Sequence, residues 1–243
     1  MARVNSEWFE FAGIKSTDMG VRMMDPHVRG RGEWRGKSLT ASGRSGDYWR
    51  TDGAYETITI KRQLRVPGSQ LDSVAAWLTG SGRLRFSYQG DRAYDARISK
   101  AIEFKWTVPG TDPLFDCEVT FVLQPFARLY PEAENIVITA SGTAIPGGNP
   151  GTAPSLPRVK ITGSGDFSLT IGMETIFFSD VTDGIIVDSE RMDALSYDGL
   201  TLANDHMGGT PFSIQPGYNV VSWMLEDGAS ISKVEITPRW RYI

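Results

Sequence analysis

The amino-acid sequence predicts a mainly β protein, in which an antiparallel β domain with one short α-helix is followed by a β-sandwich. Three observations predict this fold class. Apolar and polar residues alternate along most segments, as in antiparallel strands with one buried face. One segment instead has helical spacing. The second half contains many short apolar segments separated by glycine, aspartate and proline, which is typical of β-sandwiches.

Four segments of the first half alternate with period two, and we expect each to form a strand. They are residues 58–66, 84–88, 94–106 and 117–123. Cys117 alternates with Phe121 and Leu123 along the last of them, so we expect it to be buried as a small hydrophobic residue. Because it is the one cysteine of the chain, no internal disulfide stabilises the fold.

A short amphipathic helix is predicted between two of these strands. Apolar residues recur at helical intervals from Leu71 to Leu78, and Gly80 ends the pattern. Ser69 and Asp72 have the spacing of a capping box, in which a serine side chain accepts a hydrogen bond from a backbone N–H of the first turn. We therefore expect Ser69 to be the N-cap of this helix.

The second half is expected to consist of strands. The candidates are residues 136–138, 159–161, 167–171, 176–178, 185–187, 212–214, 220–222 and 234–236. Residues 163–166, Gly-Ser-Gly-Asp, are predicted to form a turn between two of them. We place the domain boundary at Pro131, which gives an N-terminal domain of residues 1–130 and a C-terminal sandwich of residues 131–243. The Gly/Pro-rich stretch 141–157 is then a long loop inside the sandwich.

Charge and hydropathy exclude several classes of protein. The formal net charge is −4, whereas nucleic-acid coat proteins and binders of anionic membranes are strongly basic. No apolar run approaches the length that spans a bilayer, so no membrane is expected as a partner. Residues 1–8 lack the apolar core of a signal peptide, and we therefore expect the chain to fold in a cytoplasm.

The sequence contains no convincing catalytic, cofactor or metal site. Its two histidines, His27 and His206, lie in opposite halves in loop-like contexts, and no zinc-binding motif surrounds them. Neither a nucleophile elbow nor a phosphate-binding loop is present. We therefore predict a protein that is no enzyme and carries no cofactor and no metal, with both histidines exposed in loops.

Carboxylates provide the one alternative on the side of catalysis. Asp188, Glu190 and Asp193 cluster directly after an apolar strand, and two carboxylates suffice for glycoside hydrolysis. The simpler interpretation is a solvated turn, in which aspartate and serine side chains bond to their own backbone. A small glycoside hydrolase that uses Asp188 and Glu190 stays open as an alternative.

A basic loop at residues 27–37 is the candidate partner-contact site. It carries Arg29, Arg31, Arg35 and Lys37, interleaved with glycine, and two further arginines follow at positions 44 and 50. A mobile, solvated loop is one interpretation. Contact with an acidic protein surface is the other, favoured over nucleic acid by the negative net charge of the chain.

The order of these elements resembles the distal tail (Dit) protein family of siphophages. The resemblance covers nearly the whole chain and depends on the order and spacing of short elements. They are the opening 8–14 and 17–21, Gly43–Gly46, the Tyr55 strand, the helix ending in Trp77-Leu78, the strand 84–88, the strand 119–121 with Pro125-Phe126, and residues 157–161, 163–166, 186–188 and 216–219. The arginine-rich loop and the long stretch 141–157 depart from the family pattern.

The resemblance implies a structural protein of the virion tail tip, assembled in the host bacterial cytoplasm. Its first domain would form a homohexameric ring, and its second would be a galectin-like sandwich. The ring would join the tail tube protein to the tail-associated hub or fibre protein, while DNA passes through the lumen without specific binding. In some members the sandwich holds receptor-binding proteins, so such a protein is a further expected partner.

Two other interpretations remain beside this one. A galectin-like sandwich is a common sugar binder, so the chain is alternatively a carbohydrate-binding protein used in host-surface adsorption. A tail tube protein or a tail terminator would also form a ring, but the second predicted domain argues against both.

Overall fold

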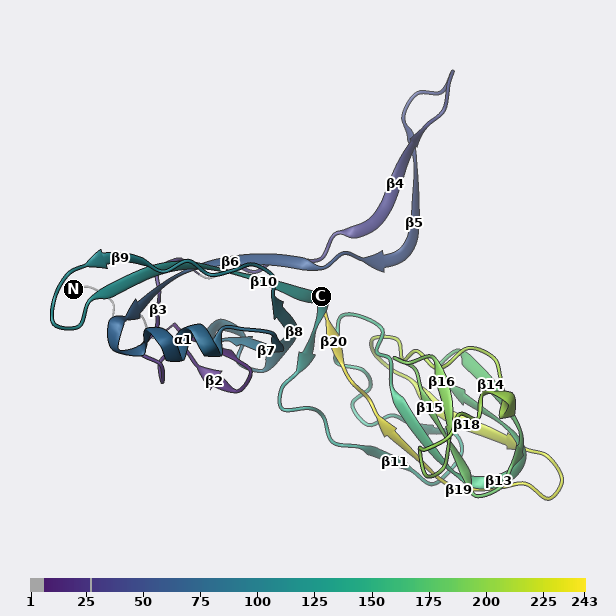
Figure 1. The fold of residues 1–243 in the computed structure, drawn as a ribbon. Helices are drawn as coiled ribbons and strands as arrows, with labels where there is room; N and C mark the ends of the chain where they lie inside the picture. Colours follow the sequence, from purple (N-terminus) through teal and green to yellow (C-terminus); the bar gives the residue numbers. More distant parts are fainter. Residues whose placement is uncertain (1–6, 27) are drawn as a thin grey trace. The chain divides into compact units, whose positions relative to one another are not determined.

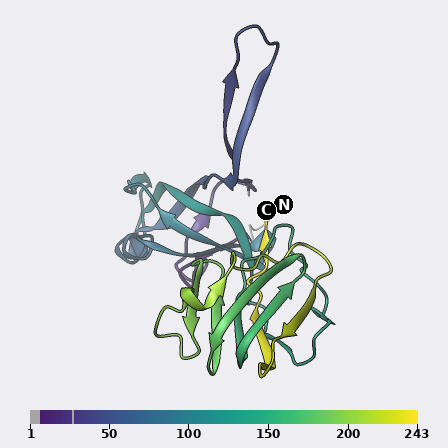
Figure 2. The same ribbon diagram turned by 90° about the vertical axis from the view of Figure 1, so that its right-hand side faces the viewer.

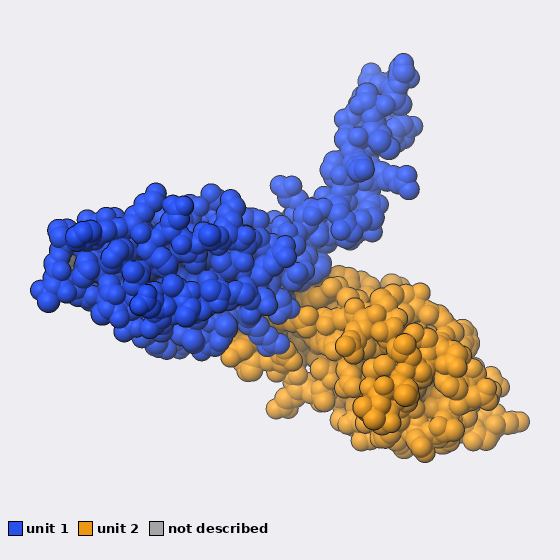
Figure 3. Space-filling model, in the orientation of Figure 1, with its two compact units in different colours: residues 1–127, 243 blue, residues 128–242 orange. Residues whose placement is uncertain are grey.

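The computed structural model describes residues 7–26 and 28–243. The expectations for His27 and for residues 1–6 lie outside these residues. Two compact units are present: unit 1 comprises residues 1–127 and 243, and unit 2 comprises residues 128–242 (Figure 3). Strands make up 53% of the structure and helices 7%, so the predicted fold class, mainly antiparallel β with one short helix, is confirmed. No helix among the described residues is long and apolar enough to cross a membrane.

Unit 1 is built on an antiparallel sheet in the order β2-β1-β7-β8-β10-β6-β3, with β9 also paired to β10 (Figure 1). Its strands are β1 (Phe9–Phe11), β2 (Ile14–Lys15), β3 (Arg22–Met23), β6 (Ile58–Pro67), β7 (Ser81–Phe86), β8 (Arg92–Ile98), β9 (Lys105–Val108) and β10 (Leu114–Leu129). The two longest strands of this sheet, β6 and β10, pair from Ile58↔Leu123 to Pro67↔Leu114.

The predicted alternation places the core of unit 1 on one face of this sheet. Ile58, Ile60, Leu64 and Val66 are all buried, as expected from their period of two. Cys117 is buried opposite Leu64, which confirms the prediction for the cysteine. Burial raises the pKa of its thiol to about 11, so little reactive thiolate is present at neutral pH.

The predicted helix is α1 (Leu71–Trp77), which packs on the core face of the sheet. The ring of Trp77 stacks on Phe9 with 5.4 Å between centroids, and its indole N–H donates a hydrogen bond of 2.9 Å to the carbonyl of Phe11. The capping-box prediction is wrong: Gln70 is the N-cap, without a side-chain hydrogen bond. The Ser69 hydroxyl and N–H instead bond the carboxylate of Asp112, which is distant in sequence and competes for these groups.

Two of the predicted strands are shorter than their patterns suggest. The strand at 84–88 ends at Phe86, and Tyr88 lies in the 3-10 turn η2 (Ser87–Gln89). The pattern 94–106 is interrupted between β8 and β9, since residues 99–104 form no strand. Periodicity indicates which face of a strand is apolar. It does not predict where a strand ends, because the end depends on backbone pairing with a neighbouring strand.

Unit 2 consists of antiparallel strands that form two sheets sharing β13. One sheet runs β11-β19-β13-β15-β16 and the other β12-β18-β13-β14-β17. The strands are β11 (Ile136–Ile138), β12 (Thr143–Ala144), β13 (Arg158–Ile171), β14 (Glu174–Val181), β15 (Gly184–Asp188), β16 (Asp193–Ser196), β17 (Met207–Gly208), β18 (Val220–Leu225), β19 (Ser230–Thr237) and β20 (Arg241–Tyr242). The 3-10 turn η3 (Asn204–His206) precedes β17.

The predicted turn at 163–166 is wrong, because these residues continue β13 from one sheet into the other. Register shifts occur at Gly163 and between Gly165 and Phe167, as in β-bulges. A Cβ at Gly163 would overlap the carbonyl oxygen of Ser230, and Gly165 has a φ of +88°. The glycines therefore bend a strand at a close backbone approach, which is the other role of glycine in β proteins.

Two further expectations for unit 2 concern the predicted strand 212–214 and the Gly/Pro-rich stretch 141–157. Residues 212–214 form no strand, and Ile214 makes an isolated bridge to Ser155. The Gly/Pro-rich stretch 141–157 lies within unit 2 and is anchored by the buried Asn149, whose amide donates hydrogen bonds to the carbonyls of Ala153 and Ile214.

Candidate assembly surface

Unit 1 carries an exposed hairpin, residues 34–55, which we call the arm. It consists of β4 (Trp34–Thr40) and β5 (Asp47–Tyr55), which form a two-stranded sheet of their own (Figures 1 and 2). Every residue of β4 is exposed, and so is β5 except near Tyr55. Isolated two-stranded hairpins are marginally stable in water, so we expect this one to be completed by another surface.

The register of the arm arranges its side chains in rows. Leu39 lies opposite Tyr48, and Lys37 lies opposite Arg50, so these four side chains share one face. Leu39 and Tyr48 are 50% and 53% exposed, and because they lie opposite each other their exposed apolar surfaces adjoin. Trp49, 61% exposed, lies on the other face against Gly36.

Polar contacts stabilise the arm only modestly. Arg35 and Asp52 form an ion pair of 2.7 Å, but both side chains are more than half exposed, so solvent screens the pair and it contributes little to stability. Asp47 accepts hydrogen bonds from Ser38 and Thr40, which lower the pKa of its carboxyl group.

The basic pair on the arm remains uncompensated. Lys37 and Arg50 lie directly opposite each other, and like charges in this position destabilise a sheet. Neither forms an ion pair with a described residue. Further toward the tip, the guanidinium of Arg44 stacks on the ring of Tyr48 at 3.8 Å. An acidic surface placed against this face would relieve the repulsion.

The structure separates the four predicted partner-contact residues. Arg29 donates a hydrogen bond of 2.6 Å to the carbonyl of Ile243 within unit 1, and Arg31 is exposed before the arm begins. Arg35 and Lys37 belong to β4, so the interpretation of 27–37 as a wholly mobile loop is wrong from residue 34 onward. That these residues contact a partner remains a prediction.

Sequence reasoning missed the apolar half of this surface. Leu39 and Tyr48 were not singled out, because the strands that carry them lack the apolar-polar alternation of a buried face. The signal that was available is the Gly43–Gly46 turn, which joins two segments of similar length, and both glycines have positive φ.

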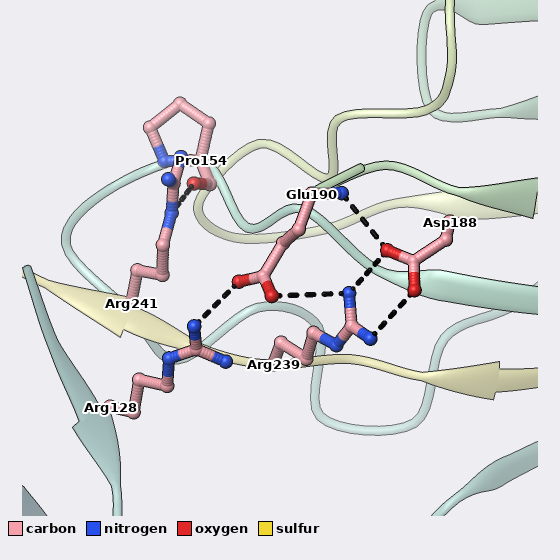
Figure 4. A network of polar contacts seen from close by, with 6 residues as sticks. All are labelled: Arg128, Pro154, Asp188, Glu190, Arg239 and Arg241. Atoms are coloured by element: carbon pink, nitrogen blue, oxygen red, sulfur yellow. Dashed lines mark hydrogen bonds and ion pairs between the residues drawn. The ribbon is translucent and has the colours of Figure 1, made fainter. Parts of the chain in front are cut away.

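Unit 2 places the candidate catalytic carboxylates in an ion-pair network (Figure 4). Arg239 donates to both oxygens of Asp188, at 2.7 and 3.0 Å. Glu190 lies 3.3 Å from Arg239 and 2.9 Å from Arg128. The side chain of Asp188 is 8% exposed, so this bidentate pair is nearly buried.

The network argues for a structural role of these carboxylates. Burial raises the pKa of Asp188, but the hydrogen bonds and positive charge of Arg239 outweigh burial and hold the pKa below its ordinary value. A general acid for glycoside hydrolysis needs the opposite shift. The arrangement therefore offers no support for the hydrolase alternative.

This network predicts a pH-dependent stability for unit 2. A carboxyl group with a lowered pKa in the folded state stabilises that state above its unfolded pKa of about 3.9 and loses the contribution as pH falls through the folded value. Urea unfolding of the chain should therefore show a loss of stability below about pH 4. In Asp188→Asn this loss should be smaller. An equal loss in both proteins would contradict the prediction.

Other candidate groups do not converge. His206, in η3, bonds the carbonyl of Ser179 through Nδ1 at 2.9 Å, and its nearest carboxylate is that of Asp205 at 4.0 Å. No group of three or more histidine, cysteine, aspartate or glutamate side chains among residues 7–26 and 28–243 is arranged to hold a metal ion. The arm is thus the feature of the described structure that most clearly calls for a function.

Comparison with known proteins identifies the fold. Neither the protein-family models nor the curated protein sequences contain a match. Among solved structures, the chain is similar to the SPP1 Dit (gp 19.1) protein, a paradigm of the hub adsorption apparatus in phages that infect Gram-positive bacteria. The two share 13% of their residues, with a TM-score of 0.74 over 98% of this chain and 99% of the other. The chain therefore has the fold of a distal tail protein.

Proposed function

We propose that this protein is a structural component of a siphophage tail tip, in which six copies form a ring and the arm of unit 1 contacts the neighbouring copy. The observation that carries the proposal is the exposed arm on a chain with a Dit-like fold along almost its whole length. The arm has unpaired edges, exposed apolar side chains and uncompensated charge. In a monomer each of these features favours non-specific association. In an assembly each can be satisfied by contact with another copy.

The alternating strands of the first domain, such as residues 58–66, also have edges that a neighbouring copy could pair with. In β6 one edge is paired with β10 along all ten residues, whereas the other is paired with β3 only at Leu64 and Arg65, so that edge stays a candidate beside the arm. A contact between the arm of one copy and a different surface of the next is heterologous. Such contacts close into a ring when the rotation that relates one copy to the next divides 360° into a whole number of equal steps.

The expected neighbours follow from this place in the virion. The ring would join the tail tube protein to the tail-associated hub or fibre protein, with DNA passing through the lumen without specific binding. Unit 2 would hold further adsorption proteins, among them a receptor-binding protein. The chain would be assembled in the cytoplasm of the bacterial host and would act as a scaffold rather than as an enzyme.

Negative-stain electron microscopy of the purified protein at high concentration tests the proposal. We expect particles with six-fold symmetry and a central hole wide enough for duplex DNA. Sedimentation velocity over a range of concentrations should show the same hexamer. A monomer at every concentration, also after mixing with the tail tube protein of the same phage, would refute the ring.

A further inference from the structure

The charges of the chain are divided unequally between the two units. Unit 2 contains 14 aspartate and glutamate residues and 7 lysine and arginine residues, which gives it a net charge of −7. The remainder of the chain has a net charge of +3, and together they make the −4 of the whole. Such asymmetry favours contacts between unit 1 of one copy and unit 2 of another.

A distinct surface strip crosses three neighbouring strands of unit 2. Ser168 of β13 lies directly opposite Phe177 of β14 on one side and Met224 of β18 on the other. Phe177 and Met224 are 64% and 77% exposed. Their backbones are two strand spacings apart, about 10 Å, and the small side chain of Ser168 lies between them.

The surface beyond this strip is acidic: Asp166 lies two residues from Ser168 in β13, Glu226 follows β18 two residues from Met224, and Asp180 lies near the end of β14. The backbone N–H of Asp180 donates to the carboxylate of Asp166 at 2.8 Å, and the N–H of Glu226 donates to the carbonyl of Asp166 at 3.0 Å. All three residues are exposed, and none forms an ion pair with a described residue. Carboxylates that gather on one surface without a cationic partner attract a cation.

The outer face of the other sheet of unit 2 provides a contrast. There Lys160 lies opposite Glu235, Lys233 pairs with Glu235 at 3.1 Å, and the ammonium of Lys160 lies 3.9 Å from the ring centroid of Tyr197. Charges of both signs alternate on that face, as on an ordinary solvated surface. The strip is therefore not a general property of unit 2.

We infer that the strip Phe177–Ser168–Met224, with the acidic surface beyond it, is the surface on which the arm of a second copy docks. The inference rests on the proposed ring and names the two surfaces of its subunit contact. On the arm, the apolar row Leu39–Tyr48 is followed two residues along by the basic row Lys37–Arg50. On unit 2, an apolar row is likewise followed by acidic residues.

The dimensions of the two surfaces agree. Consecutive outward-facing rows of a sheet are two residues apart, about 7 Å, on the arm as on the strip. The row Leu39–Tyr48 is one strand spacing wide, about 5 Å, and would lie over Ser168 between Phe177 and Met224. In this position the basic row of the arm faces the carboxylates of Asp166 and Glu226, and both uncompensated charge clusters are neutralised.

Charge reversal tests the contact. We expect Lys37→Glu with Arg50→Glu to weaken self-association at least about tenfold in sedimentation velocity, and Asp166→Lys with Glu226→Lys to do the same. The four changes in one chain should restore association to within about threefold of the original value, because each row then meets its opposite again. Lys160→Glu with Lys233→Glu, on the other sheet, is the matched control and should have no such effect.

Disulfide cross-linking gives an independent measurement, since the native Cys117 is buried. A chain with Leu39→Cys, mixed with a chain carrying Met224→Cys under mild oxidation, should yield a cross-linked dimer. The control partner is Val137→Cys, whose valine is similarly exposed at 54% but lies on β11. Equal yields with both partners, or unit 2 reversals that leave association unchanged, would overturn the inference. If the unaltered protein nevertheless forms rings, the proposed function stands and only the docking surface is wrong. If the unaltered protein forms no rings, the proposed function and the docking surface are both refuted.

Discussion

Replacement of Leu39 and Tyr48 by serine is expected to abolish ring formation while leaving the fold intact. Both side chains are about half exposed in the single chain, so their loss removes little from its own stability. In the ring each would be buried once per contact. Full burial of an exposed large apolar side chain contributes about 2 kcal/mol, and these two are already about half buried, so the double variant loses about 2 kcal/mol at every contact.

Because a ring of six closes through six such contacts, the effect is multiplied in the assembly. Sedimentation velocity should show a monomer at concentrations where the unaltered chain forms hexamers, and electron microscopy should show no rings. Circular dichroism and the urea midpoint should be unchanged. Val137→Ser, which alters a similarly exposed residue of unit 2, is the control. Hexamers that survive in the arm variant would exclude the arm from the subunit contact.

Loss of the Asp188 carboxylate is expected to destabilise unit 2 by about 3 kcal/mol. In Asp188→Ala the guanidinium of Arg239, 18% exposed, keeps its burial but loses its bidentate partner and retains only Glu190 at 3.3 Å. An uncompensated charge in such a place costs far more than the pair itself contributes. Urea unfolding at pH 7, followed through the unit 2 tryptophans, measures the change in the free energy of unfolding.

A second variant separates the pair from the unpaired charge. Asp188→Leu combined with Arg239→Met removes both charges and should recover most of the lost stability, since apolar residues replace buried ion pairs at small cost. Glu235→Ala, which breaks a more exposed pair with Lys233, should cost less than about 1 kcal/mol. A loss in Asp188→Ala no larger than that of Glu235→Ala would show that the network is not structural.

The arm shows how far sequence patterns reach. Arginine and glycine at residues 29–37 indicated a contact surface, but its apolar component stayed hidden because an exposed hairpin has no buried face and therefore no alternation. The glycines at Gly43–Gly46 stood out in the sequence, but the two strands that this turn connects were not predicted. The surface becomes evident only when the register brings Lys37 opposite Arg50 and Leu39 opposite Tyr48.

Two errors in unit 2 and in the helix have a related cause. Gly163 and Gly165 were assigned to a turn, because glycine pairs usually punctuate strands, whereas here they bend β13 as it passes between sheets. Ser69 had the spacing of an N-cap, but Asp112 binds it from another part of the chain. In both cases a contact distant in sequence decided between two locally reasonable structures.

What the sequence by itself determined is the class of fold, the position of its helix, the buried faces of its main strands and the burial of Cys117. These follow from periodicity, since a period of two or of 3.6 fixes which side chains share a face. The tertiary structure alone decided the arm, the bend of β13, the Asp188–Arg239 pair and the strip on unit 2. Each depends on residues far apart in the chain, and their proximity is set by strand pairing and packing, which no local pattern contains.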